Sequence, residues 1–280
     1  MINVVGAGIA GSIVARLLRK KGHQVRVIDD GDRFSGSGAS SNLYIASWLK
    51  KFSVDATKGI DVIESLFPAS AIDQPFSKGI GDAMKVRHIA QRHLLVKPDV
   101  VSQVALMQRP MGPPVLLDGT GTEVQGPVVF CLGYRAEDVL GPKFKTDVLV
   151  GHCLLLKGRL EPGQSSLTMP LPYRHQKIYQ FDDETIYFAD STRLKLTSFW
   201  GKDSGEKRKQ ELIKKATAAL GEREIKEHRV GYRPITPGHD FGVLQPVADG
   251  MWSINGGGKN GLVAYAKLAA ELSELIGAPC

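Results

Sequence analysis

Three glycines near the start of the chain have the spacing of a turn that binds a dinucleotide. Gly6, Gly8 and Gly11 form the pattern Gly-x-Gly-x-x-Gly. In such a turn the first glycine allows a tight bend, the second lets the backbone approach a pyrophosphate, and the third lets a helix pack closely on a strand. Asp29 follows about 20 residues later, where a carboxylate accepts hydrogen bonds from an adenosine ribose and repels a 2′-phosphate. The sequence therefore predicts dinucleotide binding, with a purely structural glycine turn as the alternative.

The segments around these glycines predict the elements that the turn requires. Residues 2–5 are an apolar run typical of a buried parallel strand, and a helical pattern of apolar side chains follows the glycines. The free N–H groups and the positive dipole end of this helix are expected to face the phosphates. Residues 24–28 form a second predicted strand. The cofactor-binding residues expected in this half are Gly6, Gly8, Ile9, Ala10, Gly11, Asp29 and Asp30.

A second glycine loop lies near the other end of the chain. Residues 255–261 (NGGGKNG) follow a predicted strand at 252–254 and precede a long apolar helix over 262–276. This arrangement predicts a second positive helix start. A nucleotide with two separated anionic or electron-poor regions would use both helix starts.

The segments between the two glycine loops predict both helices and strands. Residues 31–41 are rich in glycine and serine, as in a flexible linker or in a loop that lines phosphates. We expect a helix over 42–52, strands from Val115 and over 128–132, antiparallel sheet over 148–199, an amphipathic basic helix over 207–220 and a rigid proline-containing turn over 230–238.

The composition is that of a globular protein. The chain has 280 residues, of which 42% are hydrophobic and 23% are charged. No apolar run approaches the length of a membrane span, and the start of the chain has no signal-peptide pattern. Cys131, Cys153 and Cys280 have neither metal-ligand nor redox-pair spacing, so we expect a cytoplasmic protein without disulfides and predict no metal site.

The net charge of +7 bears on the partners of the protein. It is compatible with nucleic acid, an anionic membrane surface or an acidic small molecule. Residues 78–97 contain a cationic segment in which Asp82 is the only acid. Either a solvated helix face or a binding surface explains such a segment. Its cations are Lys78, Lys85, Arg87, His88, Arg92, His93 and Lys97.

Taken together, these motifs resemble those of the D-amino-acid oxidase and glycine oxidase superfamily of FAD-dependent oxidoreductases. The first glycine turn with Asp29 is similar to the N-terminal FAD motif of that superfamily, and residues 36–42 (GSGASSN) resemble the loop that follows it. Residues 128–134 (VVFCLGY) resemble the strand before a flavin-contacting turn. Residues 231–237 (GYRPITP) are similar to the Arg-Pro motif, and residues 256–261 to the final flavin loop. The resemblance spans the whole chain, with the motifs in family order.

The resemblance implies an α/β fold in which a Rossmann-like FAD-binding domain is interleaved with an antiparallel-sheet substrate domain. It implies an FAD-binding domain of residues 1–50, 95–150 and 235–280, and a substrate domain of residues 51–94 and 151–234. The last helix would direct its dipole at the pyrimidine side of the flavin. The further cofactor residues implied are Ser40, Ser41, Asn42, Gly133, Gly256, Gly258, Lys259, Asn260, Gly261 and Leu262.

The resemblance also implies residues for the substrate. Arg233 falls where relatives hold a substrate carboxylate, which a planar guanidinium can bind at both oxygens. A structural arginine that pairs within the turn is the alternative. Lys259 would lie near the flavin, or be an ordinary surface lysine. Tyr173 is a candidate on the substrate side and Tyr44 a weaker one, with packing as the alternative for both.

Members of this superfamily oxidise an amine carbon to an imine by passing a hydride to the flavin, and the imine then hydrolyses. Gly257 stands where relatives usually have histidine, which is expected to open room beside the flavin. The chain is also shorter than typical amino-acid oxidases. We therefore expect a reduced lid and an open site.

An open site and a positive charge favour a substrate carried on a polymer. The chain is similar to superfamily members that trim glycine-bearing thymidine in viral DNA, so cleavage of the N–Cα bond of a glycinyl-modified base in DNA or RNA is one hypothesis. Such a base would have to leave the stack. The alternative substrate is free glycine, sarcosine or another small amino acid. Two further alternatives are a nucleic-acid-binding protein with a structural FAD and an NAD-dependent dehydrogenase. The sequence leaves the oligomeric state open.

Overall fold

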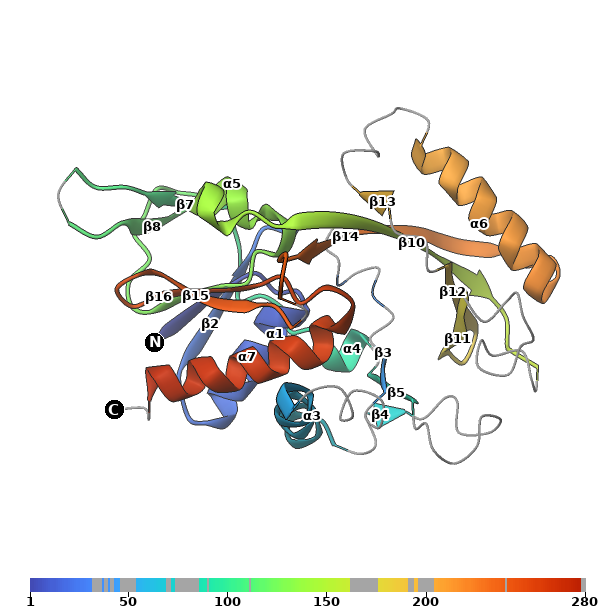
Figure 1. Cartoon of the computed structure of the whole chain (residues 1–280), viewed down its shortest axis with the longest axis horizontal. Coiled ribbons are helices and arrows are strands. Elements are labelled where there is room, and N and C mark those ends of the chain that lie inside the picture. The colour runs from blue at the N-terminus through green and yellow to red at the C-terminus, as the bar shows by residue number, and fades with distance from the viewer. Residues whose placement is uncertain are drawn as a thin grey trace.

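The computed structural model describes residues 1–31, 37, 40, 43–45, 54–68, 72–73, 86–89, 91–110, 112–161, 176–190, 194–195, 204–239 and 241–277. Within these residues the chain forms two large sheets and two small ones. Helices α1, α3 and α7 lie below the first large sheet in Figure 1, and α6 lies against the second. No helix in the described ranges is long and apolar enough to span a membrane.

The first sheet has six strands in the order β15-β16-β9-β1-β2-β6. Neighbouring strands are parallel except at the edge, where β15 runs antiparallel to β16. All four residues of β1 are buried, because the strand lies at the centre of a sheet covered on both faces. This parallel sheet confirms the predicted Rossmann-like α/β class. Its strands are β1 (Ile2–Val5), β2 (Val25–Asp29), β6 (Val100–Val101), β9 (Val128–Phe130), β15 (Val243–Ala248) and β16 (Met251–Asn255).

One face of this sheet is covered by α1 (Ile9–Lys20) and α7 (Gly261–Ile276), and α3 (Val54–Leu66) packs against α7. Helix α3 approaches α7 so closely that a Cβ atom on Gly59 would lie 2.2 Å from the carbonyl oxygen of Val263. The segment expected in the substrate domain, 51–94, includes α3, whose buried side chains nevertheless belong to the core of the first sheet.

The opposite face of the first sheet carries a second core, which contains Leu116, Phe130 and Phe144. The elements that cover it are short. They are the hairpin of β7 (Val104–Met107) and β8 (Val115–Asp118), helix α5 (Ala136–Leu140) and the 3-10 turn η3 (Pro142–Phe144).

The second sheet is antiparallel, as predicted for 148–199, and β10 lies at its centre. Side chains of β10 alternate between its faces: Leu154 and Leu156 pack toward α6, whereas Cys153 and Leu155 pack with Tyr179 on the other face. The elements are β10 (Asp147–Lys157), β11 (Gln176–Asp182), β12 (Thr185–Asp190), β13 (Leu194–Lys195), β14 (Ile225–Ile235) and α6 (Ser204–Leu220).

The helix expected over 42–52 is wrong at its start. Leu43–Ile45 instead forms β3, which pairs with β5 (Val86–Ile89) in a small sheet. A Leu-Tyr-Ile run favours a strand once a partner strand is present. Residues 46–53 lie outside the described residues. The neighbouring elements are β4 (Ile72–Asp73) and α4 (Gln91–Leu94).

The turn expected over 230–238 is also corrected. Strand β14 continues through most of this segment and ends at Ile235. Among the described strands β14 pairs with β10, on one side only, so a residue without an N–H group is tolerated at Pro234. Ile235 then forms an isolated bridge with Gly257, which ties β14 to the second glycine loop.

Candidate cofactor and substrate site

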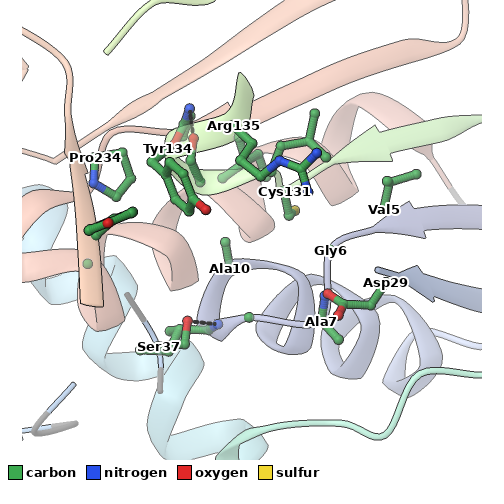
Figure 2. A pocket seen from close by; sticks show the side chains of 18 of the residues that line it. Val5, Gly6, Ala7, Ala10, Asp29, Ser37, Cys131, Tyr134, Arg135 and Pro234 are labelled. Carbon is green, nitrogen blue, oxygen red and sulfur yellow. Dashed lines mark hydrogen bonds between the residues drawn. The ribbon is translucent and has the colours of Figure 1, made fainter. Parts of the chain in front are cut away.

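A cavity of about 430 Å³ is lined by residues of both large sheets. Gly8 and Ile9 line it at the start of α1, and Gly261 and Leu262 line it at the start of α7. The structure thus brings two helix starts from opposite ends of the chain to a single cavity, as the two glycine loops predict. Figure 2 shows the first glycine turn and Asp29 on one side, with Tyr134 and Arg135 on the other.

The first glycine turn has the tight geometry that its sequence predicts. Gly6 has a φ of +106°, and a Cβ atom there would lie 2.4 Å from the carbonyl oxygen of Cys131. A Cβ atom on Gly11 would lie 1.7 Å from the carbonyl oxygen of Gly6. Gly11 therefore lets α1 pack against the turn, and it is absent from the cavity lining.

The polar groups of this turn face the cavity. The backbone N–H of Ile9 donates to Oγ of Ser37 over 2.8 Å, which Figure 2 marks with a dashed line. The N-cap residue of α1 is Gly8, which has no side chain to cap the helix. The other N–H groups of this helix start can donate hydrogen bonds to the oxygens of a pyrophosphate.

Asp29 lies at the carboxyl end of β2, where it lines the cavity. Its carboxylate accepts hydrogen bonds from the N–H groups of Ala7, over 2.6 Å, and Gly31, over 2.8 Å. These bonds hold the carboxylate at the edge where a ribose would lie. Asp30 also lines the cavity, and it forms an ion pair with Arg135.

The second glycine loop is only partly on the cavity. Gly258 and Gly261 line it, at the 3-10 turn η6 (Gly258–Asn260) and the start of α7. Gly256 and Asn260 are not among its lining residues. A Cβ atom on Gly256 would lie 1.9 Å from Oγ1 of Thr236, so this glycine permits close packing.

The expectation that Gly257 opens room is wrong, because Tyr265 fills the space. A Cβ atom on Gly257 would lie 2.9 Å from Cε1 and Cζ of that ring. Burial raises the pKa of Tyr265 to about 12, while the hydrogen bond from Gly257 and the charge of Arg233 act in the opposite direction. The phenol therefore stays protonated at neutral pH.

Arg233 lines the cavity from β14. Its charge acts on the phenols of Tyr187, in the second sheet, and Tyr265, at the start of α7. Arg233 therefore lies near the end of β14, two residues before the bridge that joins this strand to the second glycine loop.

The other predicted residues divide into three groups. Ser40 and Gly133 line the cavity, and Nδ2 of Asn255 donates to the carbonyl oxygen of Gly133 over 2.8 Å. Tyr44 is buried in the core beneath the first sheet and is not a lining residue. The residues that lie outside the described part are Ser41, Asn42, Tyr173 and the side chain of Lys259.

Residues 4–61 match the family of NAD(P)-binding Rossmann-like domains, and no curated protein sequence matches the chain. Among solved structures, the iminodiacetate oxidase IdaA from Chelativorans sp. BNC1 is 18% identical with a TM-score of 0.65, over 100% of this chain and 96% of that one. Glycine oxidase from Bacillus cereus ATCC 14579 is 15% identical with a TM-score of 0.69, over 98% and 94%. FAD-bound L-α-glycerophosphate oxidase from Mycoplasma pneumoniae is 12% identical with a TM-score of 0.57, over 96% and 92%. The chain has the fold of these oxidases.

The oxidase fold brings to the cavity residues that the sequence did not single out. Tyr134 and Arg135 follow Gly133 in the 3-10 turn η2 (Gly133–Arg135), and Tyr134 meets Tyr232 edge to face with ring centroids 4.8 Å apart. Their position after a parallel strand was the available signal, because ligands bind at the carboxyl ends of such strands. Lys177 on β11 also lines the cavity, and no motif marks it.

Within the described ranges, no group of three His, Cys, Asp or Glu residues could hold a metal ion. Cys131 and Cys153 are buried free thiols, and burial raises the pKa of Cys131 to about 12 and that of Cys153 to about 11. Neither is a ready nucleophile.

Proposed function

We propose that the protein is an FAD-dependent oxidoreductase that oxidises a glycine-type amine bearing a carboxylate. The observation that carries the proposal is the cavity, which joins the first glycine turn and Asp29 at one end to Arg233 and the start of α7 at the other. One end suits an adenosine and pyrophosphate, and the other suits an anionic substrate beside the redox-active ring.

The residues present fit a flavin dinucleotide. Gly8 and Gly261 keep bare backbone at the two helix starts, since a Cβ atom would lie 2.8 Å from Ser37 Oγ at the first and 3.1 Å from the Tyr265 ring at the second. A bound flavin supplies the hydride acceptor for the amine carbon, so the substrate becomes an imine that water hydrolyses with cleavage of the N–Cα bond. The positive end of α7 favours negative charge at this place.

Arg233 would hold the substrate carboxylate and so orient the amine carbon. A guanidinium binds both carboxylate oxygens, which fixes the rotation of the substrate as well as its position. Tyr265 remains a protonated donor beside Arg233, since burial raises its pKa to about 12. Lys259 and Tyr173, proposed for the same end, lie outside the described side chains and remain predictions.

A glycinyl-modified base in DNA or RNA is a second candidate substrate. Arg92, His93 and Lys97 are exposed around Leu95, which lines the cavity. The basic helix α6 does not support this candidate, because it packs on the face of the second sheet opposite Cys153 and Tyr179. Two of its cations, Arg208 and Lys215, also pair with Asp190. We therefore favour a small carboxylate-bearing amine.

Anaerobic mixing of the FAD-loaded protein with candidate amines tests the function. Bleaching of the flavin by glycine, sarcosine or iminodiacetate supports a small substrate, whereas bleaching only by DNA that carries a glycinyl base supports the second candidate. A colourless protein that binds NAD, or a yellow one that no amine bleaches, would contradict the proposal. The mass of the product reports whether the N–Cα bond is cleaved.

A further inference from the structure

The charged side chains that line the cavity are divided between its two ends. Among the described lining residues, the carboxylates are Asp29 and Asp30, and Arg135 pairs with Asp30. The other charged lining residues are Arg233 on β14 and Lys177 on β11, both from the second sheet. The charged side chains that the second sheet contributes to the described lining are therefore both cationic.

The strand register places these two cations on the same face of the sheet. Lys177 pairs with Ala189, which pairs with Cys153 on β10. Arg233 pairs with Leu149, four residues from Cys153 along the same strand. An even number of residues keeps both side chains on one face, in rows about 13 Å apart. The two cations are also three strands apart, so a single carboxylate does not serve both.

Packing fixes the strand that carries Lys177. Tyr179, two residues further along β11, stacks on Tyr187 with ring centroids 4.7 Å apart, and both rings are buried. Lys177 itself is partly buried at the cavity wall. An ammonium group held at such a wall interacts with an anion more strongly than an exposed one, because less water screens it.

We propose that Lys177 binds a second anionic group of the substrate. The substrate class is then a glycine-type amine with two anions, its carboxylate on Arg233 and a second carboxylate or a phosphate on Lys177. This inference rests on the proposed function. A lysine ammonium is a point charge that can bind a carboxylate or a phosphate. The structure therefore indicates a second negative charge on the substrate, and the experiment must show which group carries it.

Three probes test whether a second anion is needed and which group supplies it. Sarcosine has one carboxylate, iminodiacetate has two carboxylates, and N-(phosphonomethyl)glycine has a carboxylate and a phosphonate. We expect Lys177→Gln to raise KM for at least one of the two dianions about tenfold or more, to leave kcat within about twofold, and to spare sarcosine. Lys177→Arg should retain most of the affinity. The dianion with the lower KM in the unchanged protein identifies the source of the second anion.

Lys157→Gln is the matched control, because Lys157 lies on the same sheet, is exposed, pairs with Glu224 and is not a lining residue. It should leave every KM unchanged. Binding of succinate, followed by the change it causes in the flavin spectrum, reports on Lys177 without turnover. If Lys177→Gln weakens the binding of succinate while no amine bleaches the flavin, the second-anion site is supported and the proposed function fails. If Lys177→Gln changes the KM for all three amines equally, or for none of them, and leaves succinate binding unchanged, the inference is overturned.

Discussion

The phenol oxygen of Tyr265 lies 3.2 Å from the backbone nitrogen of Gly257 and accepts its hydrogen bond. Because the oxygen is the acceptor, the hydroxyl proton is directed elsewhere. Tyr265 is on the first turns of α7 and Gly257 precedes that helix, so the bond closes the second glycine loop onto its own helix. The Tyr265 ring, eight residues further along the chain, fills the space beside Gly257.

The first prediction concerns the packing of Tyr265 against Gly257. Gly257→Ala should lower the free energy of unfolding by about 1–3 kcal/mol, because its Cβ would overlap the Tyr265 ring. Adding Tyr265→Leu removes the ring, so part of that loss should be recovered. Thermal denaturation of the two single variants and the double variant measures the coupling between the residues. Strictly additive losses would show that the ring does not exclude a side chain at residue 257.

The second prediction concerns Arg233. Arg233→Met should lower kcat/KM for a glycine-type amine about 100-fold, because a charge-assisted hydrogen bond worth about 3 kcal/mol is lost. Arg233→Lys should have a kcat/KM between those of the unchanged protein and Arg233→Met. The FAD content should not change. Arg159→Met is the control, because Arg159 is exposed just beyond the end of β10 and its Nε donates to the carbonyl oxygen of Asp183. Unchanged kinetics in Arg233→Met would place the substrate carboxylate elsewhere.

The third prediction separates two glycines. Gly11→Ala should abolish FAD binding and lower the yield of folded protein, since its Cβ would lie 1.7 Å from the carbonyl oxygen of Gly6. Gly205→Ala should be tolerated, because α6 leaves open space around Gly205. Alanine there should add about 0.5–1 kcal/mol of stability. Absorbance of bound flavin and thermal melting measure both effects, and a flavin-loaded Gly11→Ala protein would rule out the packing described for this turn.

The fourth prediction concerns pH. Nδ1 of His152 lies 3.1 Å from Nε2 of His228 between the second sheet and α6. The pKa of His152 is lowered from 6.5 to about 4, chiefly by burial and also by the charges of His228 and Arg208, while Asp190 acts in the opposite direction. The unfolded chain therefore binds a proton below pH 6.5 that folded His152 accepts only near pH 4. Stability should fall as the pH drops through this window, by up to about 3 kcal/mol.

Urea denaturation at several pH values between 7 and 4 measures this loss. His152→Leu should flatten the dependence, whereas His239→Gln, in an exposed turn, should leave it unchanged. The same slope in His152→Leu would assign the acid sensitivity to other groups.

The first half of the site was predictable because its signals are local. Gly6, Gly11 and Asp29 belong to one strand-turn-helix-strand unit, in which the spacing of the residues fixes the geometry. The second helix start was predictable for the same reason. The fold class was implied by the resemblance of these motifs to the oxidase superfamily, and the structure confirms it.

The substrate side was predicted less completely because it depends on pairing between distant strands. The proline motif indicated a turn, but β10 supplies a partner that keeps this segment extended. Lys177 reaches the cavity only through the register of β11, β12 and β10, which a single sequence does not specify. Likewise, nothing near Gly257 signals that Tyr265 occupies the neighbouring space.

The bridge between Ile235 and Gly257 restrains how far the two large sheets can separate. It joins the strand that carries Arg233 to the loop that begins α7, next to the lining residues Pro234 and Gly258. A clamshell movement that parted the sheets at this point would have to break that link. We therefore expect the cavity to keep its width beside this bridge when a ligand binds or leaves.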